Sequence, residues 1–291
     1  MRTAREILEL IRSTAEDDRR IVAALLLGSR ANTGIGADKY QDYDVIYVVD
    51  DISEFIGTPR WVEVFGEPVL LQTPDDMVIP VGSSTTGGKP DRFAYLMLFA
   101  DYVRIDLTLV ERDALAKYVD TPASVLIDKA GGIGEAIDRA AVDQFLVTKP
   151  TQKEFSDCCN EFWWVSTYVV KGLLRAELLY AKRKLERPLR DMLLLMLSWK
   201  VGAEADFTVN LGSEYRFLKQ YLSEDEWSDL ADTYPPLSQR GIWDGLTAMT
   251  DLFERTEKAV AKKLGYSYCQ AEIDAANQYA DDNFAAIANY F

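Results

Sequence analysis

Residues 21–50 read IVAALLLGSRANTGIGADKYQDYDVIYVVD and predict how the N-terminal half of the chain folds. The run at 21–27 is continuously apolar and ends at Gly28, as a buried strand does. Residues 42–50 are rich in valine, isoleucine and tyrosine, which favours a second strand. Glycines at 34 and 36 indicate a loop between the two strands.

Two aspartates at the start of the second strand carry the sharpest chemical signal. Side chains alternate along a strand, so Asp42 and Asp44 point to the same face. Two carboxylates this close remain ionised most readily when a cation lies between them. Magnesium prefers such oxygen ligands and binds together with nucleotide phosphates. Upstream, Gly28 and Ser29 form a tight turn whose backbone N–H groups can face phosphate oxygens, helped by the Ser29 hydroxyl.

A third acid lies in a later strand, where residues 104–109 read RIDLTL. Its apolar residues alternate with Asp106, so Asp106 points away from them, and an acid there is costly unless it is paired or binds a metal. If this strand lies beside the Asp42 strand, three carboxylates converge. They could then hold magnesium and supply a base for a hydroxyl nucleophile. The alternative to a metal site is a structural role: Asp106 would be a paired acid, and Asp42 and Asp44 would be ordinary acids at the start of a strand. Arg30 either contacts phosphate or is a solvated loop arginine.

The remaining pattern changes near residue 150. Before it, we expect a helix over 3–15, strands at 69–72, 93–99 and 102–110, and a flexible loop at 80–90. After it, Thr151 and Glu154 form a capping box that begins a long helix reaching about residue 184. Further helices are expected over 188–201, 214–221, 239–263 and 271–288, and Ser223 with Glu226 caps a short one. A mixed α and β domain is therefore followed by an all-α domain.

Composition excludes several classes of protein. The formal net charge is −15, which disfavours nucleic acid as a partner and favours cationic small molecules. The chain has no histidine, which excludes histidine-based triads, zinc sites and haem ligation. Three cysteines argue against a disulfide scaffold, and Cys158 and Cys159 are expected to be small apolar filling. The N-terminus does not resemble a signal peptide and no apolar run could cross a bilayer, so we expect a cytoplasmic protein without membrane contact.

Several segments resemble the aminoglycoside 6-adenylyltransferases, which modify streptomycin and belong to the DNA polymerase β-like nucleotidyltransferase superfamily. They are GSRAN, QDYDVIYVV, FAYLMLF, RIDLTL and DCCNEFWWVSTYVVKGLLRAE, and the resemblance runs over nearly the whole chain. It implies an α+β protein. A nucleotidyltransferase catalytic domain, residues 1–149, would contain a mixed β-sheet flanked by helices. An all-α helical-bundle domain, residues 150–291, would bind the substrate.

The same resemblance implies transfer of AMP from Mg²⁺-ATP to the 6-hydroxyl of streptomycin, giving aminoglycoside resistance, by a monomer or weak homodimer. The implied catalytic and metal-binding residues are Asp42, Asp44 and Asp106. The implied nucleotide-binding residues are Gly28, Ser29, Arg30 and Lys171, of which Lys171 would contact the triphosphate. The drug-binding residues that we expect, from the spacing of the long helix rather than from the resemblance, are Asp157, Glu161, Trp164 and Tyr168.

The helix after residue 151 supports part of this assignment from its own spacing. At about 100° per residue, one narrow stripe contains Asp157, Glu161, Trp164, Tyr168, Lys171 and Arg175. The opposite side, which suits a core, contains Phe155, Cys159, Phe162, Val169 and Leu173. The stripe is acidic at its start, aromatic in the middle and basic at its end. A solvated face that suits the helix dipole would explain the charges but not the aromatic residues. A binding wall, with phosphates at the basic end and a guanidinium-bearing drug at the acidic end, would explain both.

Two other functions remain open at this point. One is a nucleotidyltransferase that acts on a different small-molecule, RNA or protein hydroxyl, although the net charge weighs against RNA. The other is a catalytically silent binding module on the same scaffold. The three aspartates weigh against the silent module, since a fold without chemistry need not keep a costly acid cluster.

Overall fold

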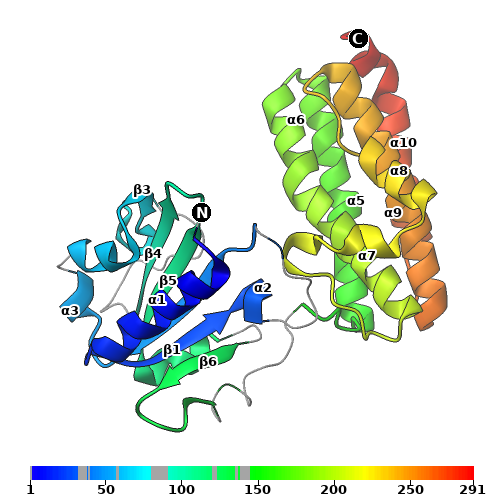
Figure 1. Cartoon of the computed structure of the whole chain (residues 1–291). Coiled ribbons are helices and arrows are strands. Elements are labelled where there is room, and N and C mark those ends of the chain that lie inside the picture. The colour runs from blue at the N-terminus through cyan, green and yellow to red at the C-terminus, as the bar shows by residue number, and fades with distance from the viewer. Residues whose placement is uncertain are drawn as a thin grey trace. The chain divides into compact units, whose positions relative to one another are not determined.

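The structure is a computed structural model that describes residues 2–31, 38, 40–56, 59–79, 91–119, 123–134, 137 and 145–291. The predicted loop at 80–90 and the glycines at 34 and 36 lie outside these residues. The chain forms two compact units, Met1–Gln144 and Phe145–Phe291, whose elements are labelled in Figure 1. Each unit is described by itself below.

The first unit contains a six-stranded sheet in the order β3-β4-β5-β2-β1-β6. The strands are β1 (Ile21–Leu27), β2 (Tyr43–Val49), β3 (Pro68–Gln72), β4 (Arg92–Phe99), β5 (Arg104–Glu111) and β6 (Ser124–Asp128). Strands β2 and β5 are parallel and the other neighbouring pairs are antiparallel, which confirms the predicted mixed sheet. The first five strands were expected from the sequence. The sixth was not, because β6 pairs at the edge of the sheet and carries exposed or half-buried side chains.

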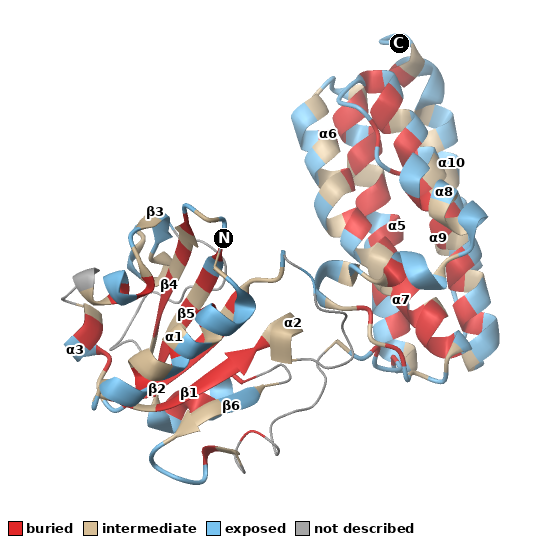
Figure 2. Cartoon of the chain, in the orientation of Figure 1, coloured by how far each residue is buried: buried red, intermediate tan, exposed pale blue. Residues whose placement is uncertain are grey.

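The two faces of the sheet are covered differently. Helix α1 (Ala4–Asp17) begins at a Thr3–Glu6 capping box and packs Ile7 and Ile11 onto one face. The hydroxyl of Tyr47 on β2 donates to the carbonyl of Ile11 at 2.5 Å, which fixes that face against α1. The opposite face carries a smaller apolar cluster that includes residues of the 3₁₀ turn η3 (Arg112–Lys117). Strands β1 and β2 are buried along nearly their whole length (Figure 2).

Short helical turns connect these strands in the first unit. They are α2 (Gly28–Ala31), α3 (Ser53–Ile56) and the 3₁₀ turns η1 (Pro59–Phe65) and η2 (Pro74–Asp76). The turn α2 follows β1 directly, so it lies at the end of the sheet where β2 begins.

The second unit is helical, as predicted. Its α-helices are α5 (Gln152–Leu174), α6 (Leu178–Lys184), α7 (Arg190–Glu204), α8 (Glu224–Asp232), α9 (Gln239–Leu264) and α10 (Gln270–Ala288). A π-helical turn, η4 (Leu185–Leu189), joins α6 to α7, and the 3₁₀ turns η5 (Ser213–Tyr215) and η6 (Leu218–Tyr221) precede α8. The predicted capping boxes at Thr151 and Ser223 are both present.

Two predicted helices of this unit have other boundaries. The helix expected to reach about residue 184 ends at Leu174, because the chain turns at Ala176 with φ 54°. Helix α6 then packs close to α5 at Gly172, where an added Cβ would lie 2.9 Å from the side chain of Ala181. The helix expected over 214–221 is two short 3₁₀ turns, since Glu214 and Tyr215 have left-handed φ angles of 54° and 57°.

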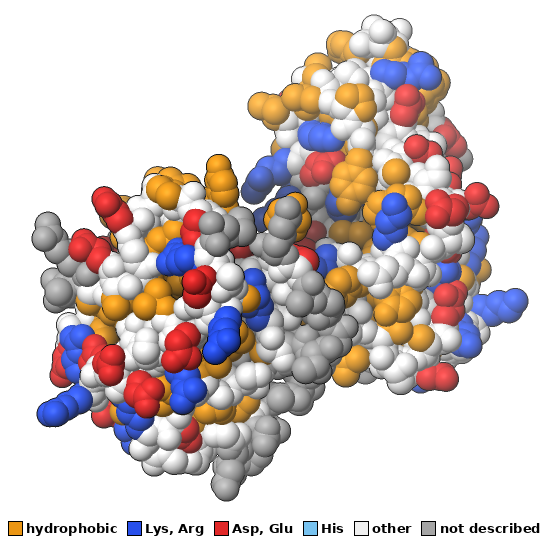
Figure 3. Space-filling model, in the orientation of Figure 1, with side chains coloured by type: hydrophobic (Ala, Val, Ile, Leu, Met, Phe, Trp, Pro, Cys, Tyr) orange, Lys and Arg blue, Asp and Glu red, His pale blue; other side chains and the backbone are white. Residues whose placement is uncertain are grey.

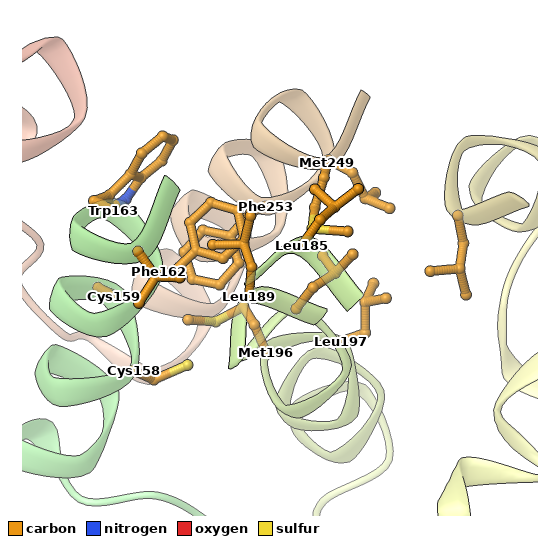
Figure 4. Close-up of a cluster of buried hydrophobic side chains, with 14 of the residues drawn as sticks. Cys158, Cys159, Phe162, Trp163, Leu185, Leu189, Met196, Leu197, Met249 and Phe253 are labelled. Atoms are coloured by element: carbon orange, nitrogen blue, oxygen red, sulfur yellow. The ribbon is translucent and has the colours of Figure 1, made fainter. Parts of the chain in front are cut away.

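The core of the helical unit confirms the predicted buried side of α5. Phe162 of α5 stacks on Phe253 of α9 with ring centroids 3.6 Å apart (Figure 4). Cys158 and Cys159 are buried free thiols beside them, as expected for apolar filling. Burial raises the pKa of the Cys158 thiol to about 12, so this thiol is not a nucleophile at neutral pH.

The surface carries its charge in a dispersed form. On the face that Figure 3 shows, acidic and basic side chains are interspersed over each unit. In the described part of the chain, none of the helices has the length and apolar character needed to cross a membrane.

Candidate active site

Strand pairing brings the predicted acids together in the first unit. Strands β2 and β5 are parallel neighbours in a register that places Asp44 directly opposite Asp106. Asp42 precedes β2 by one residue and shares the face of Asp44, two positions further along. The strand pairing on which the predicted convergence of three carboxylates depends is therefore present.

The burial of β5 confirms which way Asp106 points. Ile105 and Leu107 are buried on the face that packs with α1, whereas Asp106 is half-buried on the other face. The same alternation places Ile46 of β2 in the smaller apolar cluster on the face that carries the acids. The acids thus lie at one end of this face, where its apolar cover stops.

An arginine that the sequence analysis did not single out is bound to these acids. Arg104 donates from Nε to Oδ1 of Asp106 at 2.8 Å and from its terminal nitrogen to Oδ2 at 2.6 Å. Its Nε also lies 3.7 Å from Oδ2 of Asp42. The sequence did carry a signal for this contact, because Arg104 and Asp106 are two positions apart on one strand and so share a face.

The electrostatics of Asp42 reflect this crowding. Partial burial raises the pKa of the Asp42 carboxyl, and the neighbouring charge of Asp106 raises it further. The guanidinium groups of Arg104 and Arg30 act in the opposite direction but do not reverse the shift. The ionised form of Asp42 is therefore disfavoured in these surroundings, and a cation bound beside it would favour that form.

The turn after β1 is built against the second aspartate. Gly28 has a left-handed φ of 67°, which is a conformation that favours glycine. A Cβ at Gly28 would lie 3.2 Å from the carboxyl carbon of Asp44 and would overlap its Oδ2. Gly28 is thus required both by the backbone and by the close approach of Asp44. The neighbouring Ser29 is half-buried, and its hydroxyl has no hydrogen-bond partner among the described residues.

Arg30 is engaged by the chain itself. Its guanidinium donates to the carbonyls of Gln41, at 2.7 and 3.2 Å, and of Asp42, at 3.0 Å. It also lies 3.9 Å from the centroid of the Tyr43 ring. These contacts tie the turn α2 to the residues that lead into β2, so Arg30 helps to position Asp42. A phosphate contact by Arg30 stays a prediction.

The donor set has the chemistry that magnesium requires, but not as a preformed cage. Three carboxylates on one face supply the hard oxygen ligands that this cation prefers. Within the described residues, however, no group of three or more acidic or cysteine side chains stands in a metal-binding arrangement. Both oxygens of Asp106 accept a hydrogen bond from Arg104, so the guanidinium already lies where a metal would meet this carboxylate from that side.

In the helical unit, the predicted stripe lies on the outer side of α5. Its members are exposed or half-buried: Asp157, Glu161, Trp164, Tyr168, Lys171 and Arg175. The five residues predicted to face the core are buried: Phe155, Cys159, Phe162, Val169 and Leu173. The pattern of the helix is confirmed, but exposure alone does not distinguish a binding wall from a solvated face.

The acidic end of the stripe borders a groove of about 530 Å³. Glu154, Asp157 and Glu161 line it on α5, together with Met192, Leu195 and Trp199 of α7 and residues 148–150. Two of these acids already have partners, because Glu154 belongs to the capping box and Asp157 forms an ion pair with Lys153. Glu161 has no ion-pair partner among the described residues. The apolar side of this groove was missed, since nothing in the sequence links α7 to the stripe.

The aromatic and basic part of the stripe lies elsewhere. Trp164 is 60% exposed and borders a second groove, of about 480 Å³, between α5 and α10. Its ring nitrogen donates to the hydroxyl of Tyr168 at 2.8 Å, and the ring of Tyr168 also lies 5.5 Å from the ammonium of Lys184. Lys171 is exposed and has no ion pair within the described part of the chain. The structure therefore places Trp164 and Glu161 in two different grooves.

A buried acid in the helical core was also missed. Glu257 of α9 is 1% exposed and accepts a hydrogen bond at 2.9 Å from the ring nitrogen of Trp163, while its Oε1 has no partner. Burial raises the pKa of its carboxyl. In the sequence, Glu257 looks like any surface acid of an amphipathic helix. Only the packing of α5 on α9 reveals its burial.

Comparisons with known proteins agree along almost the whole chain. A sequence model described as streptomycin adenylyltransferase matches residues 1–282. An aminoglycoside 6-adenylyltransferase from Campylobacter jejuni is 38% identical over 92% of this chain and 91% of its own length. One from Bacillus subtilis (strain 168) is 37% identical over 92% and 93%. A crystal structure of a Bacillus subtilis aminoglycoside 6-adenyltransferase is 32% identical, with a TM-score of 0.48, over 98% of this chain and 99% of that one.

Proposed function

Because the chain belongs to the streptomycin adenylyltransferase family, whose members are nucleotidyltransferases, we propose that it transfers AMP from Mg²⁺-ATP to the 6-hydroxyl of streptomycin. In a cell, this reaction would give resistance to the drug. The observation that carries the proposal is the register of β2 and β5, which sets Asp44 opposite Asp106 with Asp42 on the same face. We further propose that residues 1–149 form the catalytic domain and that residues 150–291 bind the substrate.

Asp42, Asp44 and Asp106 are the residues that would hold magnesium in this reaction. When bound, the metal would neutralise negative charge on the phosphate chain and on the pyrophosphate leaving group. The raised pKa of Asp42 supports this role, because a bound cation would offset the burial and the Asp106 charge that disfavour its ionised form.

Asp106 is also the proposed base. Its carboxylate would take the proton of the substrate hydroxyl while that oxygen forms a bond to the α-phosphorus of ATP. The bond from the α-phosphorus to the pyrophosphate oxygen then breaks, and pyrophosphate leaves with its electron pair. Arg104 donates to both oxygens of Asp106, so the proton would have to reach a lone pair that Arg104 does not occupy. Positioning and electrostatics would supply most of the rate, because the protein forms no covalent bond.

Gly28, Ser29, Arg30 and Lys171 are proposed to bind the nucleotide. The Ser29 hydroxyl supports this role, because it lies in the turn beside Asp44 and has no partner among the described residues. Lys171 is an exposed cation without an ion pair in the described structure, as a phosphate-binding lysine should be before ATP arrives.

Glu161 is the proposed centre of the drug-binding residues, with Asp157 in the same groove and Trp164 and Tyr168 further along α5. A guanidinium group of the drug can pair with a carboxylate through two hydrogen bonds. Glu161 is the best placed for this contact, because it has no ion-pair partner among the described residues, whereas Asp157 already forms an ion pair with Lys153. The apolar side chains of Leu195 and Trp199 line the same groove and could pack against the carbon skeleton of the drug.

Product analysis by mass spectrometry tests the proposed function. The protein is incubated with ATP and magnesium, and with streptomycin, another aminoglycoside, an RNA or a protein as separate acceptors. We expect one AMP to be attached to streptomycin, at the 6-hydroxyl by nuclear magnetic resonance. A product only on the RNA or the protein would refute the substrate, and no product on any acceptor would favour a silent module.

A further inference from the structure

We propose that Arg104 is an internal counter-cation of the acid cluster, which occupies the carboxylates while no divalent cation is bound and leaves them when one binds. This inference rests on the proposed function, since it assumes that the acids bind magnesium. It assigns Arg104 as a positioning residue that sets how tightly the free protein binds the metal.

The geometry places a single guanidinium across acids from two neighbouring strands. Arg104 makes two hydrogen bonds with Asp106, at 2.6 and 2.8 Å, and lies 3.7 Å from Asp42. Those oxygens are the ones a divalent cation would need. A guanidinium this close to the carboxylates repels a metal cation that binds them, so Arg104 and the metal oppose each other at the cluster.

The remaining surroundings of Arg104 allow it to leave. Its side chain is 45% exposed, and its partners within the described structure are these carboxylates alone. Arg2 of the same unit, by contrast, has additional contacts. Arg2 pairs with Asp101 but also donates to the carbonyl of Phe65 at 2.6 Å and lies over the Phe99 ring at 4.6 Å. Arg104 lacks such anchors, so its release from the acids breaks no other contact.

The competition has a measurable consequence for metal binding. The apparent affinity for the metal equals the affinity of the molecules in which Arg104 has released the carboxylates, multiplied by the fraction of molecules in that state. For a partly exposed pair with two hydrogen bonds, we expect this to weaken metal binding about three- to tenfold. Without Arg104, the metal-free acids would repel each other, so the added metal would also stabilise the fold more than it does in the wild type.

Calorimetric titration of magnesium into the full chain, without ATP or drug, tests the proposal. The variants are Arg104→Gln, which removes the positive charge of the side chain, and Arg104→Lys, which keeps the charge but loses the bidentate hydrogen bonding to Asp106. The matched control is Arg112→Gln, because Arg112 forms an ion pair of 3.0 Å with Asp50 and is as exposed as Arg104, at 44%. Asp44→Asn identifies binding at the acid cluster. Thermal melting with and without magnesium provides a second readout.

We expect Arg104→Gln to bind magnesium about three- to tenfold more tightly than the wild type, with Arg104→Lys between them and Arg112→Gln unchanged. The melting temperature of Arg104→Gln should rise more on addition of magnesium than that of the wild type. Equal or weaker binding by Arg104→Gln, with Asp44→Asn still impaired, would overturn the role of Arg104 and leave the metal site standing. Binding that Asp44→Asn does not affect, or no binding by any protein, would overturn the proposed metal site as well.

Discussion

Replacing Gly28 with alanine should damage the site through two separate effects. The φ of 67° is unfavourable for any residue with a Cβ, at a cost of about 1–2 kcal/mol of folding stability. The new Cβ would also overlap Oδ2 of Asp44 and lie 3.2 Å from its carboxyl carbon, so the carboxylate must move. Relieving such an overlap typically costs about 1–3 kcal/mol more. A misplacement of about 1 Å at a catalytic group can lower the rate about 10²-fold.

Gly131→Ala is the matched control for the backbone effect. Gly131 lies in the same unit with a φ of 76°, and an added Cβ would meet no atom within 4 Å. Urea denaturation should show a stability loss of about 1–2 kcal/mol for Gly131→Ala and a larger loss for Gly28→Ala. Steady-state adenylyl transfer should be near normal in Gly131→Ala and reduced about 10²-fold in Gly28→Ala. A Gly28→Ala protein as active as Gly131→Ala would refute the link between Gly28 and the position of Asp44.

Three further sets of variants test the acids and the long helix. Asp42→Asn should lower turnover at least about 10²-fold. Since a raised carboxyl pKa destabilises the fold as pH rises through it, thermal melting of this variant at neutral pH should be equal to or above that of the wild type. Asp106→Asn should lower turnover about 10²–10⁴-fold while calorimetry still detects ATP and drug, and lost ATP binding would instead make Asp106 chiefly a metal ligand. Glu161→Gln should raise the Michaelis constant for drug about two- to fivefold, less so at high salt, and Lys171→Ala should raise that for ATP instead. Asp157→Asn, whose carboxylate is shared with Lys153, should have a smaller effect on the drug constant than Glu161→Gln, and an unchanged constant in Glu161→Gln would contradict its role.

The sequence predicted the fold of the N-terminal half well because its signals are local. The alternation of side chains along β2 and β5 predicts, without any tertiary information, on which face of its strand each of Asp42, Asp44 and Asp106 lies. Helical periodicity likewise separates the buried side of α5 from its exposed stripe. What remained conditional was the pairing of β2 with β5, which depends on how the whole sheet is ordered.

The features that were missed depend on contacts between parts of the chain that are distant in the sequence. The edge strand β6 is a run of only five residues with exposed or half-buried side chains, so its local pattern did not predict its pairing with β1. The break between α5 and α6 comes from the fit of Ala181 against Gly172 and from the left-handed Ala176, an uncommon conformation for alanine. Arg104 could have been placed on the face of the acids by alternation, but its reach to Asp42 requires the neighbouring strand.

The transfer of isotopic label from ATP tests the central claim most directly. The protein is incubated with streptomycin, magnesium and ATP labelled at either the α- or the γ-phosphorus, and the drug is then separated and counted. The account predicts that label enters the drug from the α-position only, and that chelation of magnesium or the change Asp44→Asn prevents it. Label entering from the γ-position, or from the α-position equally in Asp44→Asn, would contradict it.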